Sequence, residues 1–550
     1  MKLYGNKKIK DSFLNPDDEN IDHLIKNIQL FWSKIRTKVS KSSPRTKIHE
    51  GNFDFKKEAY DYELSEYGLN ENELSETIAH AMGGCIRWNE PKALYNITPT
   101  PLFTAVASTV VVNLLNPNAF WDYTSGRTLV YEKKIICHLA SLAGWNKKQC
   151  DGIFVSGGKI TNIYGIKVGI GNCMPESGKY GVNNNMVILV SESCHYSLES
   201  SCDWLGLGKN AVVRIPVNDK GQMNIPDFES IAKKKLNEGK KIACIILSGG
   251  NTTQNPMDSI KEIVGIRKKL INEFCLDYKP HIHVDSVIGW LWLYFSKKEN
   301  TKKSIDKSII DCAESIRQIK YADSFGADFH KTGLCPYISS AFIIKKQNHL
   351  RAIADNKNSK KTGGPYGTNY VQYHMLEHSR SAAPILAVWS TINYLGKKGM
   401  QDYIIHLTSM AQTFKNEIQK HGFFLLNDYS YGFTTIIMPH INVLNINKEK
   451  VSLATTEQIN SYNAFCHGFY RSISFSKQDG FNSSPLIGLI TNYKKTEKGL
   501  DYSAFRIHPN SPFLNSKICK EICNELGNLK KEYEQREWFN EKNKFEFQPK

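Results

Sequence analysis

One lysine in this sequence stands where an amine could act as a nucleophile. Lys331 directly follows His330, behind a short run of acidic and small residues, and the apolar segment 341–344 lies just beyond it. A lysine transferred from water into apolar surroundings loses basicity, and its neutral amine can then attack a carbonyl group. We therefore expect a lowered pKa for Lys331. A surface lysine at a strand end would have a similar local sequence. The residues upstream must therefore distinguish a nucleophilic lysine from a surface lysine.

Three further groups precede this lysine in an informative order. Gly157 and Gly158 lie between an apolar run and a helical stretch, His195 follows a second apolar run, and Asp285 ends a third. Glycines before a helix leave backbone amides open to a phosphate, and a buried carboxylate needs a charged or hydrogen-bonding partner. With a flat ring to stack on a ligand and the amine of Lys331, this set can hold pyridoxal phosphate.

The elements that must position these residues follow from the apolar pattern. Short apolar runs alternate with stretches of helical composition through the middle of the chain. This alternation indicates a mostly parallel sheet with helices on both faces, in which ligands bind at the carboxyl ends of the strands. We expect strands at residues 152–155, 186–190, 211–215, 242–247, 282–284 and 341–345.

The first 90 residues are expected to form a helical arm. Asn15, Pro16 and the acids after them are typical of a helix start, and apolar residues from Ile21 to Ile35 recur at helical spacing. We expect the arm to pack on a partner subunit, with a lid on its own subunit as the alternative. Further helices are predicted at residues 70–82, 102–115 and 131–142.

Composition excludes several classes of protein. The chain has 550 residues, 41% hydrophobic and 23% charged, which is ordinary for a globular protein of two or three domains. The net charge of +17 comes from scattered lysines without a basic stripe that alternates with aromatic residues. We expect a solvated surface that attracts anionic metabolites, and no nucleic-acid partner.

Cysteine usage and hydropathy point to a reduced compartment. The thirteen cysteines include no CxxC pair, and Cys519 and Cys523 would share one helix face, which favours packing over a metal site. The first residues have no apolar core, and the apolar-rich run 102–115 is too short to span a bilayer. We expect a cytoplasmic enzyme with no metal and no membrane segment.

Together the motifs resemble a known family. From about residue 95 to 400 the chain resembles the group II pyridoxal-phosphate-dependent amino-acid decarboxylases, which include glutamate, aromatic-amino-acid, tyrosine and cysteine-sulfinate decarboxylases. The resemblance rests on Ser-Gly-Gly-Lys-Ile-Thr-Asn (156–162), His-Tyr-Ser (195–197), His-Val-Asp (283–285), Asp-Phe-His-Lys (328–331), Glu-His-Ser-Arg (377–380) and, near the C-terminus, Phe-Arg (505–506).

The resemblance implies an α/β fold of the aspartate-aminotransferase type (fold type I) with a mostly parallel seven-stranded sheet. It implies a dimer-forming helical arm at residues 1–90, a large cofactor-binding domain at 91–395, and a small C-terminal α+β domain with a charged tail at 396–550. The expected assembly is a homodimer.

The resemblance also implies roles for single residues. Lys331 would form the internal aldimine, His195 would stack on the cofactor ring and Asp285 would pair with the protonated pyridine nitrogen. Arg506 would bind the substrate carboxylate. Of Tyr366 and Tyr370, on a loop around Asn356–Pro365 expected to be mobile, we favour Tyr366 for returning a proton. The implied cofactor contacts are Gly157, Gly158, Lys159, His195, Thr252, Asp285, Val287, His330 and Lys331.

The implied activity is decarboxylation of an L-amino acid, with acidic and aromatic substrates both open. Lys159, Val287 and Trp290 depart from the family pattern, so the wall of the pocket is expected to be reshaped. The alternatives are a carbon–carbon lyase of the sphingosine-phosphate type and an aldehyde-forming relative. A pseudoenzyme kept for assembly is disfavoured because lysine, aspartate and histidine are all present.

Overall fold

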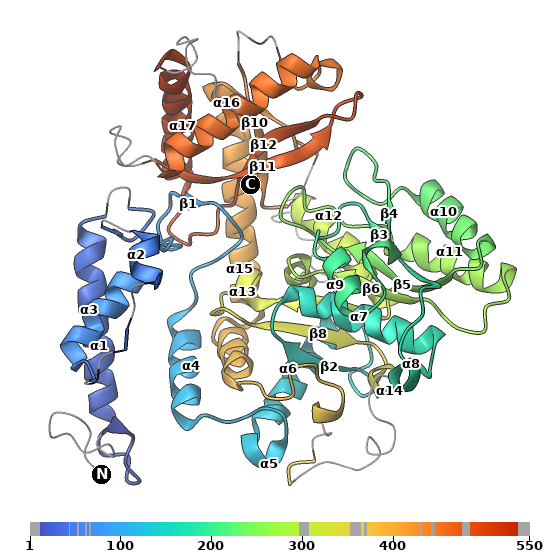
Figure 1. Cartoon of the computed structure of the whole chain (residues 1–550), viewed down its shortest axis with the longest axis horizontal. Coiled ribbons are helices and arrows are strands. Elements are labelled where there is room, and N and C mark those ends of the chain that lie inside the picture. The colour runs from blue at the N-terminus through green and yellow to red at the C-terminus, as the bar shows by residue number, and fades with distance from the viewer. Residues whose placement is uncertain are drawn as a thin grey trace.

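The computed structural model has two sheets linked by the long helix α15 (Ala383–Ile418), as Figure 1 shows. Helix α15 is kinked at Gly396, whose φ of 60° breaks the helical path. The structure describes residues 12–42, 45–51, 54–60, 63–64, 66, 68–295, 307–351, 365–367, 371–429, 432–441, 444, 446–475 and 484–536.

The larger sheet has seven strands in the order β2-β8-β7-β6-β5-β3-β4. Strands β3 to β7 run parallel to one another, whereas β8 is antiparallel to both β7 and β2. The predicted mostly parallel seven-stranded sheet is therefore confirmed. Its strands are β2 (Asp151–Val155), β3 (Met186–Ser191), β4 (Val212–Ile215), β5 (Lys241–Ser248), β6 (His281–Asp285), β7 (Ser324–Asp328) and β8 (Ser340–Ile344).

Six of these strands were predicted, each to within one residue at either end, but β7 was not. Its sequence, Ser-Phe-Gly-Ala-Asp, contains no β-branched residue and has little β-propensity. All five residues are nevertheless buried, because β7 lies in the middle of the sheet between β6 and β8. Tertiary pairing has overridden the local preference.

Both faces of the larger sheet are covered. Neighbouring residues of β3 face opposite cores: Leu189 packs with residues of α6, α10, α11 and α12, whereas Val190 packs with residues of α7 and α9. This two-sided burial explains why the strands appear as continuous apolar runs. The helices are α6 (Thr128–Leu142), α7 (Gly158–Cys173), α8 (Ser177–Tyr180), α9 (Leu198–Trp204), α10 (Ile225–Asn237), α11 (Ile260–Glu273), α12 (Lys307–Ile316), α13 (Phe329–Thr332) and α14 (Gln347–Arg351).

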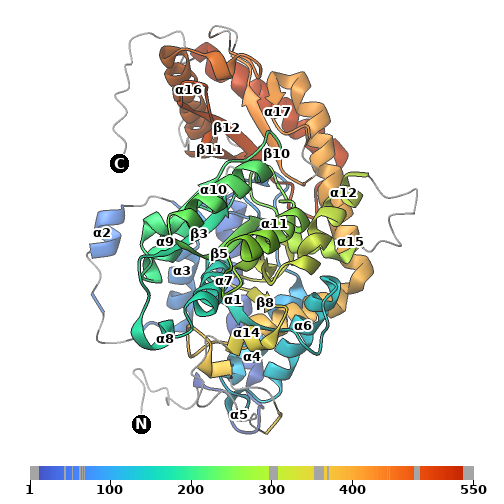
Figure 2. The same cartoon turned by 90° about the vertical axis from the view of Figure 1, so that its right-hand side faces the viewer.

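The smaller sheet has five strands in the order β1-β11-β12-β10-β9, with α16 (Thr456–Phe475) and α17 (Ser516–Arg536) beside it (Figure 2). Its first strand comes from far upstream and pairs in parallel with β11. Cys519 and Cys523 are fully buried in the core of this part, as expected for packing residues. The strands are β1 (Ala93–Leu94), β9 (Phe423–Leu425), β10 (Thr435–Pro439), β11 (Leu486–Lys495) and β12 (Asp501–Ile507).

Of the N-terminal helices, the first three stand along one side of the molecule and the last lies below α6 (Figure 1). They are α1 (Ile21–Ser40), α2 (Phe55–Tyr60), α3 (Glu71–Ala81), α4 (Phe103–Leu115) and α5 (Asp122–Ser125). The helix expected at 70–82 is confirmed, with Asn70 and Glu73 forming a capping box.

The predicted start of α1 near Asn15 is wrong. The helix begins at Ile21, because the N–H of Asp18 closes a turn on the carbonyl of Asn15 and Asp18 has a φ of 57°. In the described part of the chain, no helix has the length and apolar character needed to cross a membrane.

Candidate active site

Lys331 lies in the short helix α13, at the carboxyl end of β7. Its Nζ is 2.7 Å from Oδ2 of Asp328, which has no exposed surface. Burial alone would lower the pKa of Lys331, but the nearby Asp328 carboxylate and, more weakly, Asp285 outweigh it and raise the pKa. The expectation of a lowered pKa is therefore wrong, because the sequence did not show that a carboxylate would face the amine.

Two hydrogen bonds, from Trp290 and from His330, hold the turn that carries Lys331. The indole N–H of Trp290, in the 3-10 helix η4 (Gly289–Tyr294), donates to the carbonyl of Asp328 at 3.3 Å. His330 donates from Nδ1 to the carbonyl of Ser339 at 2.9 Å. Trp290 is fully buried, so it supports the turn. The expectation that Trp290 forms part of the pocket wall is therefore wrong.

Asp285 ends β6, next to β7, and is buried. Nδ2 of Asn162, in α7, donates to its Oδ2 at 2.9 Å, while Oδ1 has no hydrogen-bond partner in the described part of the chain. Burial raises the pKa of Asp285, although the hydrogen bond from Asn162 and the charge of Lys331 oppose the rise. A buried carboxylate oxygen without a partner is suited to a protonated ring nitrogen.

The glycine turn between β2 and α7 meets the end of β7. Gly157 has a φ of 110°, which a residue with a side chain rarely adopts, and α7 begins at Gly158. A Cβ on Gly158 would lie 2.8 Å from Oδ2 of Asp328 and 2.9 Å from Cγ1 of Val287. The amides at the start of α7 therefore lie close to the end of β7 that carries Lys331, in a cradle where a side chain on Gly158 would displace Asp328 or Val287.

The side chain of Lys159 turns away from this cradle. Its Nζ lies 4.0 Å from the ring centre of Trp204, at the end of α9. The backbone of Lys159, in the first turn of α7, remains available to a phosphate.

His195 follows β3 and completes the set. Its Nδ1 accepts from the backbone N–H of Ser197 at 3.2 Å and lies 2.8 Å from the hydroxyl of the same residue. Burial lowers the pKa of His195, and the charges of Asp285 and Lys331 both act on it, so the ring belongs to the same site. A neutral, flat imidazole there can stack on a bound aromatic ring.

Two carboxylates clamp the strand before the glycine turn. Glu132 of α6 pairs with both terminal nitrogens of Arg380, at 2.6 and 2.7 Å, and its Oε1 also accepts from the N–H of Phe154 at 2.7 Å. Oε1 of Glu377 accepts from the N–H of Ser156 at 3.2 Å. In the sequence, the Glu-His-Ser-Arg motif indicates only the family resemblance, and the contact of Arg380 with Glu132 gives the motif a structural role.

Arg506 brings a cation from the smaller sheet to the loop after β5. Its Nη1 donates to Oγ1 of Thr252 at 3.4 Å, and Tyr95 and Tyr470 lie close enough to act on its charge. Burial lowers the pKa of Arg506, and its Nε has no hydrogen-bond partner in the described part of the chain. This guanidinium is therefore suited to a carboxylate ligand.

Tyr366 lies elsewhere. Its backbone N–H donates to Oδ2 of Asp122 at 3.2 Å, and the guanidinium carbon of Arg127 is 5.9 Å from its ring centre. These contacts place it against α5 and the start of α6, and no contact among the described residues joins it to Lys331. Of the expected loop Asn356–Pro365, only Pro365 falls within the described residues, and Tyr370 lies outside them.

The structure therefore gathers most of the residues singled out in the sequence. The donor set fits pyridoxal phosphate: a cradle of free amides, a flat ring, a carboxylate with one free oxygen, and an amine. The residue that sequence reasoning missed as a positioning group is Asn162. It lies within the Ser-Gly-Gly-Lys-Ile-Thr-Asn motif, and only the packing of α7 on β6 shows that its amide reaches Asp285.

Comparisons with known proteins agree with this chemistry. Residues 56–436 match the family model for the pyridoxal-dependent decarboxylase conserved domain. L-2,4-Diaminobutyrate decarboxylase from Acinetobacter baumannii is 24% identical over 374 residues, which are 64% of this chain and 68% of that protein. The acidic amino acid decarboxylase GADL1 from Xenopus tropicalis is 21% identical over 384 residues, 69% of this chain and 70% of that protein.

Solved structures show the same fold. The apo form of mouse CSAD has a TM-score of 0.76 at 18% identity, over 92% of this chain and 98% of that one. Oryza sativa TDC with PLP and tryptamine has a TM-score of 0.72 at 12% identity, over 94% of this chain and 99% of that one.

Proposed function

Because this chain belongs to the pyridoxal-dependent decarboxylase family, and is thus a pyridoxal-phosphate-dependent amino-acid decarboxylase, we propose that Lys331 carries the cofactor and that catalysis takes place where β3, β6 and β7 end. The observation that carries this proposal is the convergence of three residues: Asp285 and Lys331 each act on the pKa of His195, and Asp285 also acts on the pKa of Lys331.

Each of these residues has a task that its surroundings support. The bound cofactor supplies an electron sink for the carbon that loses carbon dioxide. Asp285, whose Oδ2 accepts from Asn162, has an Oδ1 without a partner in the described part of the chain, which would pair with the ring nitrogen of the bound cofactor and favour its protonated form. His195 would cover the ring of the bound cofactor, and the amides at the start of α7 would hold its phosphate end, together with His330 and Thr252.

For the substrate we propose an acidic L-amino acid whose α-carboxylate is held by Arg506. The half-buried guanidinium pairs with no carboxylate in the described part of the chain, so it can bind a substrate carboxylate. The net charge of +17 attracts anionic metabolites, and GADL1 relatives are named for acidic amino acids. An aromatic substrate is the second candidate, because Tyr95 and Tyr470 beside Arg506 offer ring faces.

We further propose a homodimer in the cytoplasm. Helix α1 has no buried residue, and Phe103 and Leu115 of α4 are 93% and 73% exposed, so both helices present apolar surface that a second copy could cover. All thirteen cysteines are free, as expected in a reducing compartment. Light scattering after size-exclusion chromatography tests the dimer, and a single-chain mass would contradict it.

A carbon-dioxide release screen over the twenty L-amino acids tests the activity. We expect release from an acidic amino acid, with formation of the amine, and no release by Lys331→Ala. Release from aromatic amino acids alone would favour the second substrate class. Formation of an aldehyde would favour the aldehyde-forming relative, and cleavage of a phosphorylated amino alcohol without any decarboxylation would favour the carbon–carbon lyase.

A further inference from the structure

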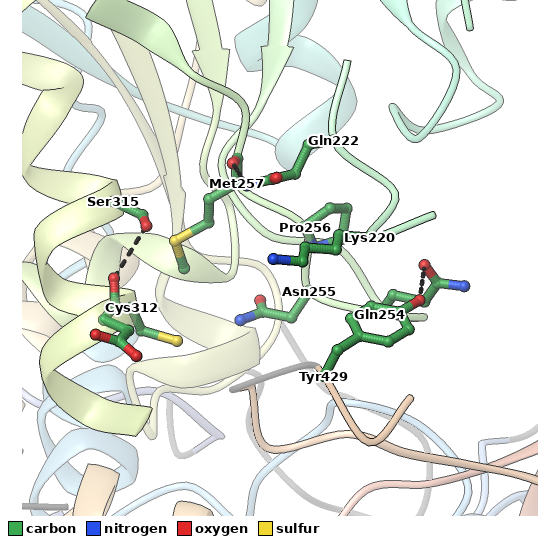
Figure 3. Close-up of a pocket in the computed structure, with 10 residues that line it drawn as sticks. Lys220, Gln222, Gln254, Asn255, Pro256, Met257, Cys312, Ser315 and Tyr429 are labelled. Carbon is green, nitrogen blue, oxygen red and sulfur yellow. Dashed lines mark hydrogen bonds between the residues drawn. The ribbon is translucent and has the colours of Figure 1, made fainter. Parts of the chain in front are cut away.

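A cavity of about 200 Å³ lies apart from the residues that surround Lys331 (Figure 3). It opens between the loop after β5, the turn after β4, the helix α12 and the segment after β9. The polar residues that line it and enter the argument are Lys220, Gln254, Asn255, Asp311, Ser315 and Tyr429.

Asn255 is the residue that points to a ligand. Its side chain is buried, with 7% of the residue exposed, yet neither Oδ1 nor Nδ2 has a hydrogen-bond partner in the described part of the chain. A buried amide without hydrogen-bond partners destabilises the fold, and a ligand that forms hydrogen bonds with this amide would offset that cost. Figure 3 shows the amide directed into the space between its own loop and Cys312.

Two opposite charges flank this amide. Lys220 is exposed on the turn after β4, Asp311 is partly exposed on α12, and neither forms an ion pair among the described residues. The hydroxyl of Ser315 already donates to the backbone carbonyl of Asp311, at 2.9 Å. Among the described residues, the cavity is therefore lined by a cation and an anion without ion-pair partners and by a buried amide without hydrogen-bond partners.

We propose that this cavity is a second ligand site that binds a small zwitterionic amino acid. Lys220 pairs with the ligand's carboxylate, Asp311 with its ammonium group, and Asn255 with a polar side chain. The volume is below that of sites for drug-sized molecules and suits a metabolite of this size.

The loop after β5, which lines the cavity, also serves the active site. Oε1 of Gln254 accepts from the hydroxyl of Tyr429 at 2.8 Å, so the loop and the smaller part of the molecule meet at the cavity. Two residues earlier, Thr252 bonds Arg506. An occupant that pairs with Asn255 holds this loop in place, and we expect it to raise the melting temperature of the protein.

Calorimetric titration of the holoenzyme with L-glutamine tests the proposal, since its side-chain amide can pair with that of Asn255. We expect saturable binding that is weakened at least about tenfold in Lys220→Gln and in Asn255→Gly. Glycine adopts the φ of 53° found at Asn255, so the loop keeps its path in that variant. Lys234→Gln, an exposed lysine on α10, is the matched control and should bind as the wild type does.

Two measurements separate this site from the active site. Carbon-dioxide release from L-glutamine is followed in parallel, so that heat of turnover is not counted as binding. Binding should persist in Arg506→Lys, because Arg506 belongs to the proposed substrate site and does not line the cavity. Binding that disappears in Arg506→Lys but survives in Lys220→Gln and Asn255→Gly would overturn the proposal, as would the absence of saturable binding up to about 10 mM, a concentration beyond weak millimolar affinity.

Discussion

Lys331 and Asp328 form an ion pair at the carboxyl end of β7, with Nζ 2.7 Å from Oδ2. Asp328 has no exposed surface, and its carboxylate lies beside Gly158 at the start of α7. The same carboxylate therefore faces the amine and the glycine cradle. It raises the pKa of Lys331, so that without cofactor the amine is protonated at neutral pH.

Replacing Asp328 should change how fast the cofactor is captured. Only a neutral amine attacks an aldehyde, and Asp328→Asn lowers the pKa of Lys331 by removing the charge that raises it. We expect apo Asp328→Asn to capture pyridoxal phosphate faster than apo wild type at pH 7. The difference between the two capture rates should narrow as the pH rises, because the wild-type amine then loses its proton. The rise of visible absorbance measures capture, with Lys331→Ala as the blank. If the capture rates of the two proteins had parallel pH dependences, the role of Asp328 in raising the pKa of Lys331 would be contradicted.

The hydrogen bond from Asn162 should set the acid limit of activity. This bond lowers the pKa of Asp285 against the effect of burial, so Asn162→Ala raises that pKa. Asp285 then becomes protonated at a higher pH, and the acid limb of the pH profile of kcat moves upward, by up to about one unit for the loss of one hydrogen bond. Asn237→Ala, an exposed residue at the end of α10, should leave the profile unchanged. A shift toward lower pH in Asn162→Ala would disprove the assignment.

A methyl group on Gly158 should impair cofactor binding. The new Cβ would lie within 3 Å of both Asp328 and Val287, in the cradle between α7 and β7. We expect Gly158→Ala to weaken binding of pyridoxal phosphate at least about tenfold, because overpacking of a close contact costs about 1–3 kcal/mol. Fluorescence titration of the apo-protein measures the affinity.

The matched control is Gly265→Ala in the middle of α11. A Cβ there meets nothing within 4 Å, so this change should leave cofactor affinity intact and stabilise the helix by about 0.5–1 kcal/mol. Equal affinity of the Gly158→Ala variant and wild type would show that the cradle tolerates a side chain.

Breaking the Glu132–Arg380 pair should strongly destabilise the fold. Both side chains are buried, and Glu132 also accepts the backbone N–H of Phe154 in β2. Glu132→Gln leaves the guanidinium without its counter-charge, and breaking a buried pair of this kind costs about 3–5 kcal/mol. Urea unfolding monitored by circular dichroism measures the loss. Asp402→Asn, which removes an exposed pair with Lys398, should have little effect.

Much of the fold and the site could be predicted because parallel β–α units are locally encoded. Each buried strand leaves a short apolar run, and the carboxyl ends of parallel strands meet at one edge. Asp285 and His195 follow such runs, so the sequence alone indicated that they would converge with Gly158. Tyr366 is different: its predicted role depends on where a long segment lies, and the structure places its backbone against Asp122.

The sequence by itself determined the order of the site residues, the class of fold and the cofactor chemistry, because residue types and their positions after strands are local properties. Tertiary structure alone decided that β7 is a strand, that Asn162 reaches Asp285 and that Asp328 faces Lys331. The sign of the pKa shift at Lys331 followed from this last contact. Burial and Coulomb attraction oppose each other there, and which of them wins depends on a distance of a few ångströms that no local pattern encodes.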